Sequence, residues 1–279
     1  MARANEHRRP ARGRGRDQAR PEGRAVPAGE ALVYGLHAVA ALLERARDRV
    51  HEVILQEGRG DARIQALVER ATAAGVAVTR RPRQELDEAW PEWNHQGALA
   101  RCRESAPLGE QDLAELLQRV EQPLLLVLDG VQDPHNLGAC LRTADAAGVT
   151  AVVAPRDKAA GLTPVVRKVA CGAAETVPFV TVTNLARTLR GLREAGLWVV
   201  GTAGEAERDI HHADLTGPLV LILGAEGKGL RRLTRVHCDF LVSIPLRGSV
   251  SSLNVSVATG ICLFEALRQR DAKGEAGQG

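Results

Sequence analysis

Three short segments of the sequence combine amide, hydroxyl or charged side chains with glycines, and each follows an apolar stretch. The first segment, residues 128–144, contains Asn136 and, six positions later, Arg142. Arginine presents a planar fork of donors that matches phosphate oxygens, so an amide and a guanidinium on nearby faces of one helix favour phosphate or ribose recognition. A structural interpretation stays open, in which Asn136 caps the helix and Arg142 forms a surface salt bridge.

The second segment, residues 221–230, is Leu-Ile-Leu-Gly-Ala-Glu-Gly-Lys-Gly-Leu. Its glycines allow close backbone approach to a ligand and positive φ angles. The segment is not a Walker A motif, because Lys228 is followed by Gly229 and not by Ser or Thr, and it contains no G-x-G-x-x-G fingerprint. An ordinary phosphate loop and a dinucleotide loop are therefore excluded, which leaves another kind of ligand loop or a plain glycine-rich turn.

The third segment, residues 244–260, begins with Ile244 and Pro245 and places Ser252 and Asn254 at the start of a helical pattern. Such groups at a helix N-terminus can cap the helix, bind an anion or orient a substrate, and the pattern alone does not decide between these roles. Small residues then permit close packing of another helix. They are Ser256, Ala258, Thr259 and Gly260.

The elements that must position these segments form an α/β pattern from residue 123 onward. Short, almost wholly apolar strands are predicted at 124–128, 151–154, 177–180, 197–202, 219–223 and 241–244. Helices are predicted between and after them, at 137–147, 163–171, 184–195, 230–237 and 253–268. This alternation predicts a parallel sheet covered on both faces, with a site beyond the carboxyl ends of its strands.

A smaller α/β unit precedes this pattern. Helices are predicted at 36–45 and 62–74, and strands at 52–55, 76–79 and 97–102. We therefore expect a disordered Arg-rich tail at 1–30, a first domain at 31–103, a linker at 104–120, a second domain at 121–270 and a disordered end at 271–279.

The charge of the chain is unevenly distributed. Residues 1–30 hold eight arginines and four acidic residues, which gives this segment a net charge of +4. Because the whole chain carries +3, the remaining residues carry a net charge of −1. The tail is either a nonspecific RNA-binding arm or a solvated extension. Aromatic residues make up only 3% of the chain, which argues against a module that works chiefly by stacking bases.

Cysteine and hydropathy patterns indicate a cytoplasmic protein. The five cysteines form no Cys-x-x-Cys pair, so a disulfide framework or zinc site is not expected, and they are interpreted as small core residues in a reducing cytosol. No apolar run approaches the roughly 18 residues that span a bilayer. His135 beside Asp133, and the pair His211 and His212, build no converging cluster, so no metal is expected.

Taken together, the three segments resemble the signature motifs of the SpoU (TrmH-like) branch of the SPOUT methyltransferases. These motifs are N-x-G-x-x-x-R, L-G-x-E-G-x-G and I-P-x followed by S-L-N-x-S-x-A, and the resemblance covers residues 124–268. The first domain resembles the family's substrate RNA-binding domain, with Tyr-Gly-Leu-His at 34–37 and His-Gln-Gly at 95–97. Residues 169–175 and 250–262 are most similar to members that methylate a guanosine ribose in 23S ribosomal RNA.

The resemblance implies a second domain with a deep trefoil knot, which composition could not show. It implies S-adenosyl-L-methionine bound in the knot, and a homodimer in which the helix at 253–268 packs against the partner and each active site borrows residues from the other subunit. The residues expected to bind the cofactor are Thr202, Gly204, Gly224, Ile244, Pro245 and Leu253. The Arg-rich extension departs from the compact family pattern.

The implied reaction is an in-line methyl transfer to a ribose 2′-hydroxyl, which depends on positioning and on removal of a proton. A guanidinium almost never releases its proton, so we expect Arg142 to hold a phosphate and stabilise negative charge. Asn136, Ser252 and Asn254 would orient the ribose. Glu226 would fix Arg142 or its own loop.

Two alternatives stay open. A transfer RNA methyltransferase of the same family would share every catalytic residue and differ in the first domain. A non-catalytic ribosomal RNA-binding assembly protein would have lost some of them, and the presence of all five weighs against it. They are Asn136, Arg142, Glu226, Ser252 and Asn254.

Overall fold

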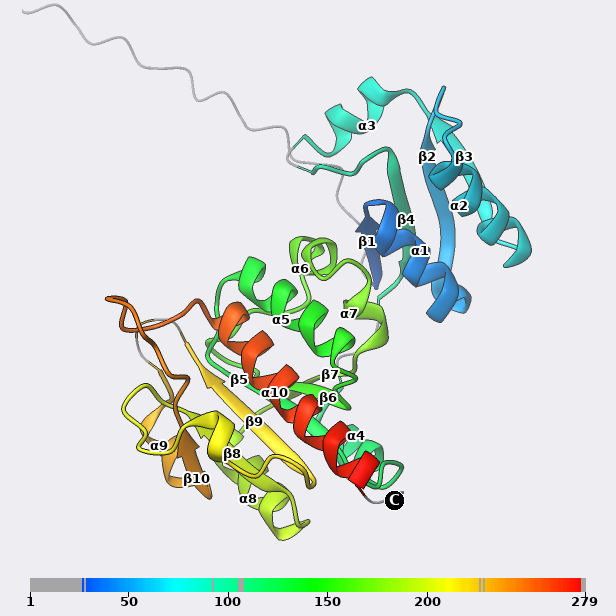
Figure 1. Cartoon of the computed structure of the whole chain (residues 1–279). Helices are drawn as coiled ribbons and strands as arrows, with labels where there is room; N and C mark the ends of the chain where they lie inside the picture. Colours follow the sequence, from blue (N-terminus) through cyan, green and yellow to red (C-terminus); the bar gives the residue numbers. More distant parts are fainter. Residues whose placement is uncertain are drawn as a thin grey trace, which may run out of the picture.

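The computed structural model describes residues 27, 29–91, 93–104, 108–225, 227 and 229–276, arranged as two units that each contain one sheet (Figure 1). Most of the Arg-rich tail predicted at 1–30 lies outside the described residues, so that prediction stays untested. Among the described residues, no helix is long and apolar enough to cross a membrane.

The first unit is a four-stranded sheet in the order β1-β4-β2-β3. Its strands are β1 (Glu30–Tyr34), β2 (Val50–Gln56), β3 (Ala77–Arg81) and β4 (Ala98–Arg103), and β4 runs antiparallel to both of its neighbours. Apolar residues of α1 (Leu36–Arg45) and α2 (Ala62–Ala73) pack on one face, and the 3-10 turn η1 (Arg47–Arg49) follows α1. The other face is covered by α3 (Arg83–Ala89) and by the two tryptophans after it.

The second unit is a six-stranded, wholly parallel sheet in the order β10-β8-β9-β5-β6-β7. The strands are β5 (Leu124–Asp129), β6 (Ala151–Pro155), β7 (Phe179–Val182), β8 (Trp198–Thr202), β9 (Leu219–Gly224) and β10 (Phe240–Val242). Side chains alternate between two buried clusters, as in β5, where Leu126 and Val127 belong to opposite faces. The predicted parallel sheet with two covered faces is confirmed.

Helices cover the two faces of this sheet. One face carries α5 (Pro134–Ala146), α6 (Pro164–Val169), α7 (Ala173–Thr176) and α10 (Val255–Ala276), with the turn η2 (Ile210–His212) against α10. The other carries α4 (Glu110–Leu117) and α8 (Leu185–Glu194), beside which α9 (Arg232–Val236) lies. Figure 1 shows α10 running along α5 across the front of the sheet.

Several predicted boundaries are wrong. The predicted linker at 104–120 contains α4, whose Leu113 is buried against the second sheet, so this part belongs to the second unit. The end predicted to be disordered at 271–279 is helical through Ala276, because Arg270 donates to the Pro123 and Gly217 carbonyls and Lys273 to Thr216. The sequence patterns missed β1 and α3.

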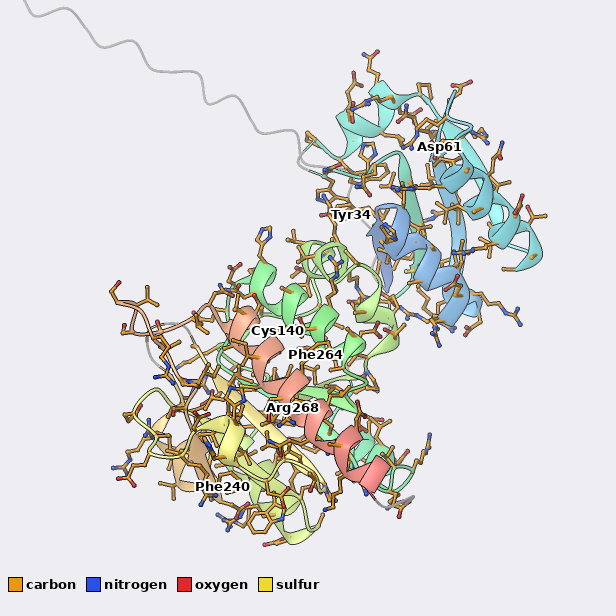
Figure 2. The ribbon with its side chains drawn as sticks, viewed as in Figure 1. Tyr34, Asp61, Cys140, Phe240, Phe264 and Arg268 are labelled. Atoms are coloured by element: carbon orange, nitrogen blue, oxygen red, sulfur yellow. The ribbon has the colours of Figure 1, made fainter. Side chains whose placement is uncertain are left out.

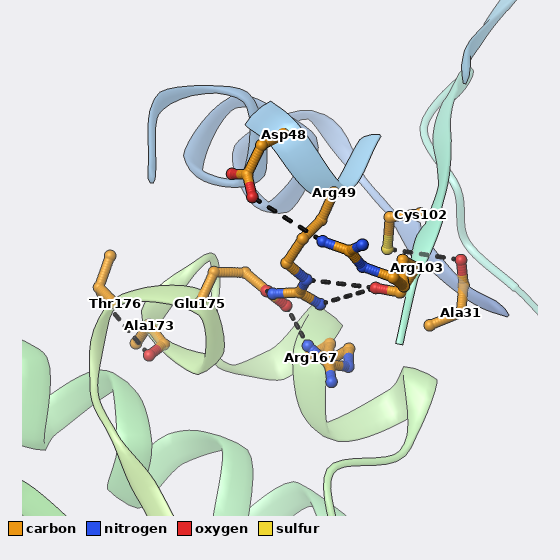
Figure 3. A network of polar contacts seen from close by, with 9 residues as sticks. All are labelled: Ala31, Asp48, Arg49, Cys102, Arg103, Arg167, Ala173, Glu175 and Thr176. Carbon is orange, nitrogen blue, oxygen red and sulfur yellow. Dashed lines mark hydrogen bonds and ion pairs between the residues drawn. The ribbon is translucent and has the colours of Figure 1, made fainter. Parts of the chain in front are cut away.

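The two units are joined by an ion pair network around Glu175 in α7 (Figure 3). The Glu175 carboxylate accepts from Arg167 of the second unit and from Arg49 of the first, the latter at 3.2 Å. Arg49 also donates to the Arg103 carbonyl at the end of β4. Only 2% of the Glu175 side chain and 6% of that of Arg167 is exposed, so both charges depend on their partners.

We predict that Glu175→Ala lowers the free energy of unfolding by about 3–5 kcal/mol, because it removes the carboxylate that pairs with the buried Arg167 and the partly buried Arg49. The matched control is Glu44→Ala, which breaks an exposed pair with Arg70 and should cost less than about 1 kcal/mol. Urea unfolding followed by circular dichroism measures both. Equal losses in the two variants would show that the buried network does not hold the units together.

Candidate active site

The carboxyl ends of β8, β9 and β10 and the start of α10 surround a cavity of about 690 Å³. Its walls are main chain and aliphatic side chains from all three strand ends, with hydroxyl and amide groups on the α10 side. Most residues predicted to bind a cofactor line it, namely Thr202, Gly204, Gly224, Ile244 and Leu253. Pro245 is the exception, since it lies between the lining residues Ile244 and Leu246.

The glycine-rich loop after β9 folds back on itself. Ala225 and Gly229 form an isolated antiparallel bridge, and Gly227 and Gly229 have φ angles of +72° and +61°. A Cβ atom at position 224 would collide with the backbone of Gly229 and Leu230. The glycine at 224 therefore makes room for the loop itself, and not only for a ligand as the sequence suggested. Glu226 and Lys228 lie outside the described residues.

Asp129, at the end of β5, anchors the far side of this loop. Its side chain is buried, and it accepts from the Arg231 backbone N–H at 2.9 Å while its other oxygen lies 3.3 Å from the Arg231 guanidinium. No sequence pattern predicts this contact, because Asp129 and Arg231 are 102 residues apart and no local motif connects them.

The first and third motifs meet through two asparagines. Asn254 donates from Nδ2 to Oδ1 of Asn136 at 3.0 Å, and its own Oδ1 accepts from the Ser256 backbone and hydroxyl at 2.9 and 2.6 Å. Asn254 thus caps the start of α10, which is one of the roles that the sequence left open for it. The capping role considered for Asn136 is wrong, since Asp133 caps α5 by accepting from the His135 N–H.

Small residues let α5 and α10 pack closely behind this pair. Thr259 is fully buried, and its hydroxyl lies 3.3 Å from the Cys140 thiol of α5. Thr143 of α5 faces Gly260 of α10. The amide pair therefore sits at one end of a rigid helix interface, and Ser252, which also lines the cavity, lies just before α10.

Arg142 lies apart from the cavity. It is exposed on α5 and points toward the turn between α6 and α7, where its Nη1 is 3.6 Å from the Cys171 sulfur. It pairs with no carboxylate among the described residues, so the surface salt bridge considered for it is not present there. Lys168, three residues before Cys171 in the chain, lies over the Tyr34 ring of the first unit, with its amine 5.3 Å from the ring centroid. Burial lowers the pKa of this amine.

Cysteine burial differs from the prediction at one position. Cys102, Cys140 and Cys262 are buried, Cys238 is half-buried, and burial raises the pKa of Cys238 and Cys262 to about 12. Cys171 is exposed beside Arg142 and is therefore not a core residue. Within the described part of the chain, no three or more His, Cys, Asp or Glu side chains converge as a metal site would need.

An ion pair on the cavity wall was also not predicted. Arg235 of α9 lies 2.5 Å from Glu205, and both residues line the cavity. Hydrogen bonds from the Glu205 backbone and from Arg235 hold the pKa of this carboxylate below its usual value. The two residues are distant in sequence and lie outside the three motifs, so spacing alone gave no signal for them.

Comparisons with known proteins find relatives over both units. Residues 123–264 match the SpoU rRNA Methylase family, and residues 32–108 match the RNA 2′-O ribose methyltransferase substrate binding family. The chain is 64% identical over 242 residues to the 23S rRNA (guanosine-2′-O-)-methyltransferase RlmB of Pseudomonas putida, covering 86% of this chain and 97% of that protein. It is 57% identical over 239 residues to RlmB of Escherichia coli K12, covering 86% and 98%.

A solved structure extends the similarity to the three-dimensional level. The SpoU methyltransferase AviRb from Streptomyces viridochromogenes, crystallised in complex with AdoMet, superposes with a TM-score of 0.73 at 27% identity. The match covers 88% of this chain and 92% of that one, so it includes both units.

Proposed function

The chain belongs to the SpoU rRNA methylase family, and we propose that it transfers a methyl group from S-adenosyl-L-methionine to the ribose 2′-hydroxyl of a guanosine in 23S ribosomal RNA. The observation that carries this proposal is the cavity at the ends of β8, β9 and β10, with two of the three family motifs on its walls and the first motif bonded to it through Asn136. The first unit would bind the RNA.

The cavity fits S-adenosylmethionine in size and chemistry. Its volume of about 690 Å³ lies within the range of pockets for small molecules, roughly 300–1,000 Å³, and its walls combine apolar and polar surface in similar amounts. When bound, the cofactor supplies an electrophilic methyl group on a positively charged sulfur. The residues that would hold it are Thr202, Gly204, Gly224, Ile244 and Leu253, with Pro245 beside them.

Positioning by this chain's own side chains accounts for the rest of the chemistry. The coupled amides of Asn136 and Asn254 would orient the ribose together with Ser252, at the mouth of the cavity. Arg142 would bind the adjacent phosphate and stabilise the negative charge that develops as the hydroxyl gives its proton to solvent, while the methyl group passes to the oxygen and S-adenosylhomocysteine leaves. Glu226 would fix the glycine-rich loop or Arg142.

We further propose a homodimer with the family's trefoil knot, acting in the cytoplasm where ribosomal RNA is processed. Apolar residues on α10 and the loop before it are exposed, with Val257 52%, Phe264 50% and Val250 60% accessible (Figure 2 labels Phe264). A second copy of this surface would cover them. Because Arg142 lies away from its own cavity, the dimer would bring it to the cavity of the other subunit.

The first experiment follows labelled methyl from S-adenosylmethionine into unmodified 23S ribosomal RNA and, separately, transfer RNA, with nucleoside analysis of the product. We expect label in 2′-O-methylguanosine from the 23S RNA. Label only in transfer RNA would keep the chemistry and overturn the substrate, and no label in naked RNA or assembling subunits would favour the non-catalytic binding protein.

A complementation test addresses the shared site. Arg142→Ala and Asn254→Ala should each abolish most turnover. If each site combines Arg142 of one subunit with Asn254 of the other, a heterodimer of the two variants, co-expressed with different tags and purified on both, keeps one intact site and roughly half the wild-type activity. A heterodimer as inactive as the parent variants would place both residues of a site in the same chain.

A further inference from the structure

A second cavity, of about 510 Å³, lies in the first unit, away from the one described above. It is formed by the end of β2, by α3 and by the loop that leads into β4. Its walls are mostly polar, unlike those of the first cavity. The lining residues that matter here are Gln56, Arg59, Arg83, Trp93, Asn94 and Gln96.

Trp93, which lines this cavity, belongs to an aromatic stack. The Trp93 ring lies 4.4 Å from that of Tyr34 at an angle of 16°, and Trp90 follows at 6.3 Å. Three of the chain's seven aromatic residues are thus gathered here. Trp93 is partly buried against the core of this unit and also lines the cavity, so the exposed part of its ring can contact a planar ligand there. The low aromatic content of the whole chain hides this local concentration.

The loop beside Trp93 is held in an unusual backbone shape. Gln96 has a φ of +52°, which is rare for a residue with a side chain, and Gly97 has +70°. His95, only 4% exposed, bonds Asp87 through Nε2 at 3.0 Å and accepts the Gly97 N–H on Nδ1 at 3.0 Å. Backbone strain of this kind persists only where the surrounding structure enforces it, and it is concentrated at functional sites.

Two arginines enter the cavity, and their present partners are exchangeable. Arg59 pairs with the exposed carboxylate of Asp61 at 2.6 Å, and Arg83 pairs with that of Asp87 at 3.2 Å. Surface pairs like these contribute little, so the two guanidinium groups can also bind a phosphate while Asp61 and Asp87 stay in place. Arg59 also donates to the Gln96 carbonyl at 2.6 Å, which places a cation directly at the strained loop.

We infer that this cavity binds one unstacked nucleotide of the RNA substrate, with its base on Trp93, its edge facing the amides of Asn94 and Gln96, and its phosphate at Arg59 and Arg83. An aromatic face beside amides and guanidinium groups is the combination that recognises splayed-out RNA bases, and duplex RNA presents no such base. The inference rests on the proposed function, because it takes RNA as the ligand. It adds a holding site distant from the methyl transfer cavity.

Intrinsic fluorescence tests this directly. The full chain with Trp90→Phe and Trp198→Phe keeps Trp93 as its sole tryptophan. A single-stranded RNA dodecamer of mixed sequence should quench its emission, and the same strand in a duplex should bind at least about tenfold more weakly to this site. Arg83→Gln should weaken single-strand binding about five- to tenfold. It should also reduce the slope of log affinity against log salt concentration by about one, as expected for the loss of one phosphate contact.

The matched control is Arg63→Gln on α2, another exposed arginine of the same unit that does not line the cavity. It should change affinity less than about twofold. Single-strand binding without quenching, equal quenching by the duplex, or equal losses in the Arg63 and Arg83 variants would overturn the inference. Thermal unfolding confirms that each variant is folded.

Methyl transfer to 23S RNA separates this inference from the proposed function. Arg83→Gln should raise KM for RNA and leave kcat at saturating RNA within about twofold of the wild-type value, because Arg83 lies outside the methyl transfer site. A chain that shows Trp93 quenching and no methyl transfer refutes only the proposed function. A chain that methylates 23S RNA without Trp93 quenching refutes only the nucleotide site.

Discussion

The contact between α5 and α10 is the constraint on which the functional site depends. The two helices begin after strands at different places in the sheet, yet their small residues pack against each other, and Asn254 joins them at the cavity end. This amide caps α10 with its oxygen and holds Asn136 with its nitrogen. Any change that separates the helices therefore removes one wall of the cavity and misplaces both amides together.

A second contact places the RNA-binding unit relative to this site. The buried Glu175 carboxylate ties α7 to the first unit, and Lys168 packs over Tyr34, whose other neighbour is Trp93. The segment that carries Lys168 also carries Cys171 beside Arg142. The aromatic stack of the first unit and the arginine proposed to grip phosphate are therefore linked through one short stretch of the second unit.

Local patterns predicted most of the fold, because helices and buried strands leave periodic signals in the sequence. They missed β1, which begins inside the predicted tail, and α3, whose only buried residue is Leu86. The motifs predicted the cavity at the strand ends. Asp129 with Arg231, and Glu205 with Arg235, could not be predicted, since each pair is created by tertiary packing and not by spacing.

If Asn136 and Asn254 act as one unit, a double-mutant cycle on kcat/KM for methyl transfer will reveal their coupling. Asn254→Asp keeps the capping oxygen and removes the donor to Asn136, while Asn136→Ala removes the acceptor. We predict that each change alone is costly and that the double variant is little worse than either, with a coupling energy above about 1 kcal/mol. Effects that add within about 0.5 kcal/mol would show that the two amides act independently.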